Sequence, residues 1–418
     1  MTTNPKPLTM NPSYLAMVRG TRELHQLLAQ GKDDSPEADA VRDRTDGPWQ
    51  VLSEVERNRV RNLSEDLYSL TEPSRPQRPM NSQAQAKLLE AFEARERGEW
   101  DRALDLLRRW QAYIEPSLVS YLRGSIWLEA GDPDTAAIFY RHALELDPTN
   151  GNYHAMALYC LNLSDPLAAL QEATEILKDP EKSSAGVVAR AADITLMSAR
   201  LKSGTEADQT FHQLEPILAN TIARMEKGDP NEFDRTTYVT LLSLSGFGYE
   251  FLGNTQAALA LYSAALQIDP TNDALYVARG MLLYGTSGRA ITDLEIAMQY
   301  GTPLVWPYVM LAHHHLLAGR FEESRKLSEQ AIRVGGSAAV MSEVWEWMAI
   351  AQTHLGFPAD VIRASFDNAI RLDPSNERAK RNVAAFESAT RPISWQTRSI
   401  GAVRISALAE RRYAMAAA

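Results

Sequence analysis

Three consecutive histidines, His313, His314 and His315, are the most obvious candidates for chemistry in this sequence. Imidazole nitrogens are common zinc ligands, and they titrate near neutral pH. Successive residues of a helix point about 100° apart, so three adjacent rings cannot converge on one metal ion. A helical zinc site instead uses two histidines four residues apart, with a further ligand nearby. We therefore expect no metal and no cofactor, with His315 between helix pairs and His313 facing an inner surface.

No other catalytic pattern stands out. Cys160 lies in the apolar run 156–163, which is typical of a buried structural thiol. The patterns G-x-x-x-x-G-K-[ST] and G-x-S-x-G are both absent from the sequence. Acidic residues are spread along helix faces, so no pair of carboxylates can be assigned to acid–base catalysis. We predict that the protein has no catalytic residues and is not an enzyme; an enzyme or metal protein centred on His313 is the alternative.

The helices that carry these residues follow an internal repeat. Small and aromatic residues recur at fixed offsets between positions 239 and 272, and the same offsets recur 122 residues earlier. The two sets are Gly246, Tyr249, Gly253, Ala258, Tyr262, Ala265 and Pro270, and Gly124, Trp127, Gly131, Ala136, Tyr140, Ala143 and Pro148. Such recurrence defines a unit of about 34 residues, which is typical of repeat proteins built from helix pairs.

Each position of the unit has a mechanical role in a pair of helices. Gly246 and Ala258 are small enough to let two helices approach closely, and Tyr262 fills the space between neighbouring pairs. Gly253 suits the tight turn between the helices, because glycine tolerates positive φ. Pro270 ends the second helix, because the residue before a proline is pushed out of the α region. The pattern therefore predicts an all-α protein of stacked helix pairs.

This pattern resembles the tetratricopeptide repeat family, whose units share these small, aromatic, glycine, alanine and proline offsets. The resemblance implies a right-handed α-solenoid of about seven helix pairs. It also implies a concave groove, lined by the first helix of each pair, that receives a peptide or helix of a partner protein. Chaperone-binding members of the family use a clamp of lysine and asparagine for a carboxylate tail, and this sequence has no such residues at matching offsets.

Proline spacing and the repeat period divide the chain into parts. Pro73, Pro76 and Pro79 mark an extended linker that cannot bury a core. The period fails after residue 182, and Pro216 interrupts a long helix there. The expected parts are a separate N-terminal helical arm (1–70), a linker (71–85), the repeat array (86–376) with an irregular pair at 183–228, a capping helix (377–390) and a basic amphipathic tail (391–418).

The tail, residues 391–418, has five arginines and one acidic residue, Glu410, with apolar residues between the charges. Three arrangements fit this composition: a frayed end, an added amphipathic helix, or a segment that lies along the acidic surface of the array. Five arginines without a wider basic surface do not indicate a nucleic-acid site.

Composition restricts the partners and the compartment. A net charge of −10 and 45% hydrophobic residues over 418 positions fit a long helical core and argue against nucleic acid as a partner. The sequence has no run of 18 apolar residues and no secretion signal, so we expect no membrane contact. A single cysteine excludes an intramolecular disulfide. We predict a cytoplasmic protein whose partner is a protein or peptide.

The resemblance places ten candidate partner-binding residues on the exposed side of the first helices. They are Tyr121, Leu128, Phe247, Glu250, Val277, Met281, Tyr284, Trp306, Val309 and His313. Aromatic surface residues suit protein recognition, but large exposed apolar patches are uncommon in monomers, so cover by the chain's own arm or tail is the alternative. The leading hypothesis is a protein-interaction scaffold or adaptor. The other is a self-assembling homo-oligomer in which the arm or tail docks on a neighbouring copy.

Overall fold

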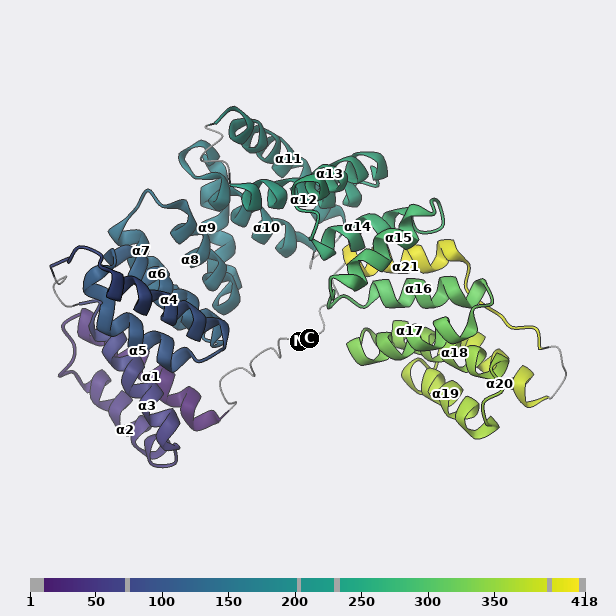
Figure 1. The fold of residues 1–418 in the computed structure, drawn as a ribbon, viewed down its shortest axis with the longest axis horizontal. Coiled ribbons are helices and arrows are strands. Elements are labelled where there is room, and N and C mark those ends of the chain that lie inside the picture. Colours follow the sequence, from purple (N-terminus) through teal and green to yellow (C-terminus); the bar gives the residue numbers. More distant parts are fainter. Residues whose placement is uncertain (1–10, 72–75, 201–203, 229–233, 389–392, 413–418) are drawn as a thin grey trace. The chain divides into compact units, whose positions relative to one another are not determined.

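Helices make up most of the described chain. The computed structural model describes residues 11–71, 76–200, 204–228, 234–388 and 393–412. These residues contain 21 α-helices, two short 3₁₀-helices and no strand (Figure 1). The fold is therefore all-α, as the sequence predicts. The chain forms two compact units, residues 1–194 and 195–418.

Unit 1, residues 1–194, begins with three helices and continues with successive helix pairs. Its helices are α1 (Pro12–Ala29), α2 (Pro36–Gln50), α3 (Glu54–Tyr68), α4 (Ser82–Glu96), α5 (Trp100–Trp110), α6 (Pro116–Glu129), α7 (Pro133–Leu146), α8 (Gly151–Ser164), α9 (Pro166–Lys178) and most of α10 (Ala185–Arg200). The 3₁₀-helices are Gln111–Tyr113 and Pro180–Lys182.

Unit 2, residues 195–418, continues the pairs and ends with two further helices. Its helices are the end of α10, α11 (Gly204–Lys227), α12 (Arg235–Phe251), α13 (Thr255–Ile268), α14 (Asp273–Leu283), α15 (Arg289–Gln299), α16 (Trp306–Leu317), α17 (Phe321–Val334), α18 (Ala338–His354), α19 (Ala359–Leu372), α20 (Glu377–Glu387) and α21 (Ile400–Arg412).

The described part of the repeat array contains seven regular helix pairs whose two helices pack against each other. They are α4–α5, α6–α7, α8–α9, α12–α13, α14–α15, α16–α17 and α18–α19. The helices α10 and α11 occupy the irregular stretch, and α11 continues through Pro216. About seven pairs is therefore the observed number.

The repeat residues do what their types predict. A Cβ atom on Gly246 would lie 2.7 Å from the ring of Tyr262, so only glycine allows this crossing of α12 and α13. The matching pair in unit 1 is Gly124 and Tyr140, at 3.0 Å. Gly253 has a φ of +72°, and Asn254 caps α13 by accepting a hydrogen bond from the N–H of Ala257. These contacts explain the repeat pattern.

The first three helices do not form a separate arm, which corrects the sequence-based expectation for residues 1–70. Buried side chains of α1 and α3, such as Tyr14 and Leu63, belong to the same hydrophobic cluster as Leu104 of α5. Arg22 of α1 also pairs with Asp132 at 2.6 Å, in the turn between α6 and α7. The apolar stripe of α3 is thus buried against the first repeat.

The helix α2 continues through Pro48 to Gln50, and the ring of Trp49 lies beneath the guanidinium groups of Arg57 and Arg61. One local expectation in unit 1 also needs correction. The expected linker 71–85 overlaps α4, since Asn81 caps that helix at Ser82. Residues 1–10 of the expected arm and 72–75 of the linker lie outside the described residues.

The C-terminal segment combines two of its three expected arrangements. After α20, residues 393–399 have no regular structure, and α21 then packs against α14 and α16 (Figure 1). The segment therefore lies along unit 2 and also contains an added helix. Residues 389–392 and 413–418, which belong to the expected capping helix and tail, lie outside the described residues.

Candidate functional site

The ten predicted groove residues are mostly not exposed. In unit 1, Tyr121 and Leu128 are half-buried, and the ring of Tyr121 lies 5.2 Å from that of Tyr153. In unit 2, the eight others are buried, and the most accessible of them, Trp306, is only 8% exposed. These eight are Phe247, Glu250, Val277, Met281, Tyr284, Trp306, Val309 and His313. For them the predicted exposure is wrong.

The chain's own C-terminal segment packs against the helices that carry several of these residues. Val403, Ala407 and Leu408 of α21 are buried in one hydrophobic cluster with Val277 and Val309. A helix places residues 403, 407 and 408 on one side, and the opposite side carries Ile405, which is 69% exposed. We call the surface of α12, α13, α14, α16, α18 and α20 that contacts residues 393–411 the tail-covered face.

Backbone atoms of residues 393–399 are held by two side chains of the tail-covered face. Asn382 of α20 donates from its amide nitrogen to the carbonyl oxygen of Gln396 at 2.9 Å, and its amide oxygen accepts from the N–H of Gln396 at 2.9 Å. His313 of α16 lies 2.9 Å from the carbonyl oxygen of Arg398 through Nε2. These hydrogen bonds involve only main-chain groups of the segment, so they do not depend on the side chains of Gln396 and Arg398.

The side chains of Trp395 and Arg398 make specific contacts with the tail-covered face in addition to the main-chain bonds. The indole N–H of Trp395 donates to Nε2 of His354 at 3.0 Å, and its ring lies 6.1 Å from that of Phe366. Arg398 pairs with Glu343 of α18 at 2.5 Å. Burial raises the pKa of Glu343, an effect that the nearby charge of Arg398 opposes.

A buried carboxylate positions the asparagine that reads the backbone. Glu346 of α18 is fully buried and accepts hydrogen bonds from Arg378, at 2.7 Å, and from the amide nitrogen of Asn382, at 2.6 Å. The amide of Asn382 is thus oriented before it meets Gln396. Its nitrogen has two protons, one for Glu346 and one for the carbonyl oxygen of Gln396.

The histidine cluster has structural roles. Since a carbonyl oxygen only accepts, Nε2 of His313 carries the proton, and Nδ1 faces the hydroxyl of Tyr284 at 3.0 Å. Burial lowers the pKa of His313 to about 4. Among the described residues, no group of three or more His, Cys, Asp or Glu side chains could hold a metal ion. Cys160 is fully buried, as expected, and burial raises the pKa of its thiol to about 12.

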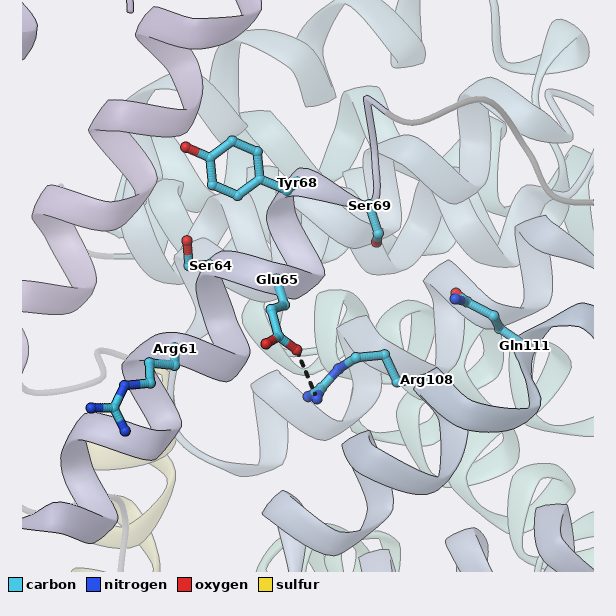
Figure 2. Close-up of a pocket in the computed structure, with 7 residues that line it drawn as sticks. All are labelled: Arg61, Ser64, Glu65, Tyr68, Ser69, Arg108 and Gln111. Atoms are coloured by element: carbon cyan, nitrogen blue, oxygen red, sulfur yellow. Dashed lines mark hydrogen bonds and ion pairs between the residues drawn. The ribbon is translucent and has the colours of Figure 1, made fainter.

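Unit 1 contains a polar cleft that the sequence analysis did not find. Its volume is about 490 Å³, and it lies between α3 and α5. Figure 2 shows the residues that line it and the ion pair between Glu65 and Arg108, at 3.3 Å. Arg108 also pairs with the fully buried Asp66, at 3.0 Å. Charged groups that neutralise each other in this way hold α3 against α5.

Several contributors to the tail-covered face were missed by sequence reasoning. Glu343, Glu346 and His354 lie on α18 and Asn382 lies on α20, and no spacing rule connects them with residues 393–398. The tail itself gave a usable signal, since its arginines and apolar residues complement an acidic array. No described helix combines the length and the apolar character needed to cross a membrane.

Comparisons with known proteins agree with the repeat pattern. Residues 88–151 match the model of the tetratricopeptide repeat family. No curated protein sequence matches the chain.

Similar solved structures include a tetratricopeptide repeat protein from Parabacteroides merdae, with 17% identity, 69% of this chain and 100% of that chain covered, and a TM-score of 0.37. Yeast Tom70 has 14% identity, 70% and 76% coverage and a TM-score of 0.28. PilW, a type IV pilus biogenesis factor, has 12% identity, 73% and 100% coverage and a TM-score of 0.26. These TM-scores are low, so no argument rests on the superpositions. Residues 88–151 thus match tetratricopeptide repeats, and the helix pair at 239–272 has the same residue offsets as the pair at 117–150.

Proposed function

We propose that this protein is a non-enzymatic adaptor whose tail-covered face binds a partner segment that is extended at first and then helical. Tetratricopeptide repeats support a protein-interaction scaffold in general. The observation that carries this binding mode is the pair of hydrogen bonds between the side chain of Asn382 and the main chain of Gln396. The helix α21, which follows in the sequence, packs against α14 and α16. In this proposal, residues 393–411 occupy the place of the partner.

Main-chain recognition supports a peptide ligand over a small molecule. A surface that binds backbone N–H and C=O groups accepts many sequences, and neighbouring pockets then select side chains. Asn382 supplies the first kind of contact, and the surroundings of Trp395 and Arg398 supply the second. The carboxylates of this face, Glu343 and Glu346, are paired with arginines. That pairing favours binding over acid–base catalysis.

The test uses a full-length chain with a protease site inserted after Thr390, so that the tail can be cut after folding. Cut protein from which the tail has been washed away is used to capture proteins from the source cell. We expect it to retain a partner that the uncut protein does not. A synthetic peptide of residues 393–413 in excess should release that partner. Failure of the peptide to compete would contradict the proposal.

A matched variant tests the backbone contact. Asn382→Ala in the cut protein removes both bonds to the partner main chain and should weaken capture at least ~5-fold, since each bond contributes on the order of 1 kcal/mol. Ile405→Ala in the competing peptide is the control and should compete as well as the unchanged peptide. The cytoplasmic location stays a prediction, which cell fractionation tests.

Assembly through the tail is the second candidate, because one chain carries both the tail and its binding face. Docking within a chain benefits from an effective concentration of roughly millimolar, which exceeds ordinary protein concentrations. We therefore expect a monomer in light scattering at micromolar concentration. A dimer that disappears when the tail is cut would favour the exchange of tails between copies.

A further inference from the structure

The end of α21 enters a site built from one acidic and two aromatic side chains. Arg411 lies with its Nε 3.2 Å from Oε2 of Glu250 and with Nη2 3.3 Å from the hydroxyl of Tyr262. Its guanidinium carbon is 5.1 Å from the ring centre of Phe247 and 5.8 Å from that of Tyr262. We call Phe247, Glu250 and Tyr262 the arginine socket.

Because the arginine socket is buried, its carboxylate requires a positively charged partner. Glu250 is only 1% exposed, and Tyr262 is fully buried. Oε2 of Glu250 accepts from Arg411 at 3.2 Å and from the Tyr262 hydroxyl at 3.1 Å, while Oε1 has no hydrogen-bond partner among the described residues. A buried carboxylate is costly unless a cation compensates it. The socket is therefore a site for a positively charged group.

The geometry selects a guanidinium over an ammonium. A guanidinium is planar, so its faces can lie against aromatic rings while its edge donates to two acceptors at once. Arg411 does this with Glu250 and Tyr262 through different nitrogens. A lysine carries one compact ammonium on a flexible stem, so it cannot reproduce this planar, two-point contact.

A second arginine, Arg200, indicates that the arginine bound in the socket lies in the last turn of its helix. Nη2 of Arg200 donates to the carbonyl oxygen of Arg411. The guanidinium carbon of Arg200 also lies 4.9 Å from the ring centre of Phe247, which belongs to the socket. Carbonyl groups in the last turn of a helix lack partners within the helix, and a positive charge is favourable there. Arg200 thus marks the position of a helix C-terminus.

We propose that the arginine socket selects partner helices that carry an arginine in their last turn, on the same side as two small or branched apolar residues four and eight positions earlier. In α21 these are Ala407 and Val403. This specificity rests on the proposed function of the tail-covered face. It names the chemistry of the partner: an amphipathic helix that ends in arginine.

The test keeps the receptor unchanged and varies only the peptide. Full-length protein with the protease site after Thr390 is cut, and fluorescent peptides of residues 393–413 are bound to it. We expect Arg411→Ala to weaken binding at least ~30-fold, because truncation leaves Glu250 buried and unpaired. Arg411→Lys should weaken binding about 10-fold or more, and Ile405→Ala less than 2-fold.

The outcomes separate the two proposals. If the Arg411→Ala and Arg411→Lys peptides bind within 2-fold of the unchanged peptide, the socket is not selective and this inference fails, while the proposed function stands. If the unchanged peptide does not bind at all, both fail. A receptor with Tyr262→Phe supplies a second measurement: it should reduce the loss caused by Arg411→Ala, since one of the two acceptors has been removed.

Discussion

His313 shows how one side chain connects the tail to the array. Its ring is fully buried, and it lies between the hydroxyl of Tyr284 and the carbonyl oxygen of Arg398. In the neutral ring, the proton on Nε2 is donated to the carbonyl oxygen of Arg398, and Nδ1 lies 3.0 Å from the Tyr284 hydroxyl, which also lies 2.9 Å from the carbonyl oxygen of Met310. A charged ring would carry an uncompensated positive charge close to the guanidinium groups of Arg398 and Arg378, which also lower the pKa. Burial is the largest cause of the low pKa of about 4.

Acid should therefore destabilise the folded state through His313. Its pKa is about 4 in the folded state and 6.5 in the reference state, so the unfolded chain binds a proton first as pH falls. Stability from this residue is complete above pH ~6.5 and is lost progressively down to pH ~4, by at most ~3 kcal/mol. His313→Gln does not titrate, and the difference in unfolding free energy between it and the unchanged protein should vary over this range. Parallel pH profiles would refute the assignment.

At the level of helices, crossings depend on residues without a side chain. Gly246 allows α13 to cross α12 closely, with the ring of Tyr262 against the glycine, as the repeat pattern predicts. A second glycine two residues on, Gly248, was not singled out by that pattern. A Cβ atom on it would lie 1.8 Å from the ring of Phe211, which is fully buried in α11. This contact joins the irregular helix to the regular array.

Gly248→Ala tests this crossing. Overpacking a core costs about 1–3 kcal/mol, and the better helix propensity of alanine returns up to ~1 kcal/mol. We expect a net loss of about 1–2 kcal/mol in urea unfolding. Gly288→Ala is the matched control, because that position has open space and a φ of −60°. It should stay within about 0.5 kcal/mol of the unchanged protein. Equal midpoints for the two variants would show that Phe211 moves freely.

The sequence carries the information for each helix pair, because the residues that meet lie close together in the chain. Gly246 and Tyr262, or Gly253 and Asn254, are separated by 16 residues or fewer, and their types alone indicate their contacts. The tail-covered face is different. Asn382 and Gln396 are brought together by an irregular segment, and nothing in either residue type names the other. Three α-helices separate α1 from α5 in the sequence, and eight separate α12 from α21, so a single sequence offers no spacing rule for such contacts.

Within the whole of unit 2, the tail is part of the hydrophobic core. Val403, Ala407 and Leu408 are as well buried as the residues of α14 and α16 that they cover. Of the eight residues predicted to line an open groove, Phe247, Glu250 and His313 contact residues 398–411 directly. Val277 and Val309 share a core cluster with α21. The pattern of one helix pair predicts which residues face away from that pair, and it carries no information about a segment more than 80 residues away in the sequence that packs there.

Cutting and removing the tail should loosen the helices beneath it. Amide hydrogen exchange in α14 and α16 should accelerate at least ~10-fold when residues 393–418 are gone, because local stability follows buried apolar contact. The same measurement on α6 and α7, in unit 1, is the internal control and should not change. Protection of α14 and α16 that survives tail removal would mean that these helices do not depend on α21.

The hydrogen bonds between Asn382 and the main chain of Gln396 also affect the concentration that a partner needs in order to bind. In the proposed function the tail competes with the partner, and because the tail is attached to the array it cannot be diluted away. If the tail is docked 99% of the time, an incoming helix with an intrinsic Kd of ~1 µM behaves as one of ~100 µM. A small change to the tail, such as the loss of one arginine, would then shift the partner concentration needed for occupancy without altering the receptor.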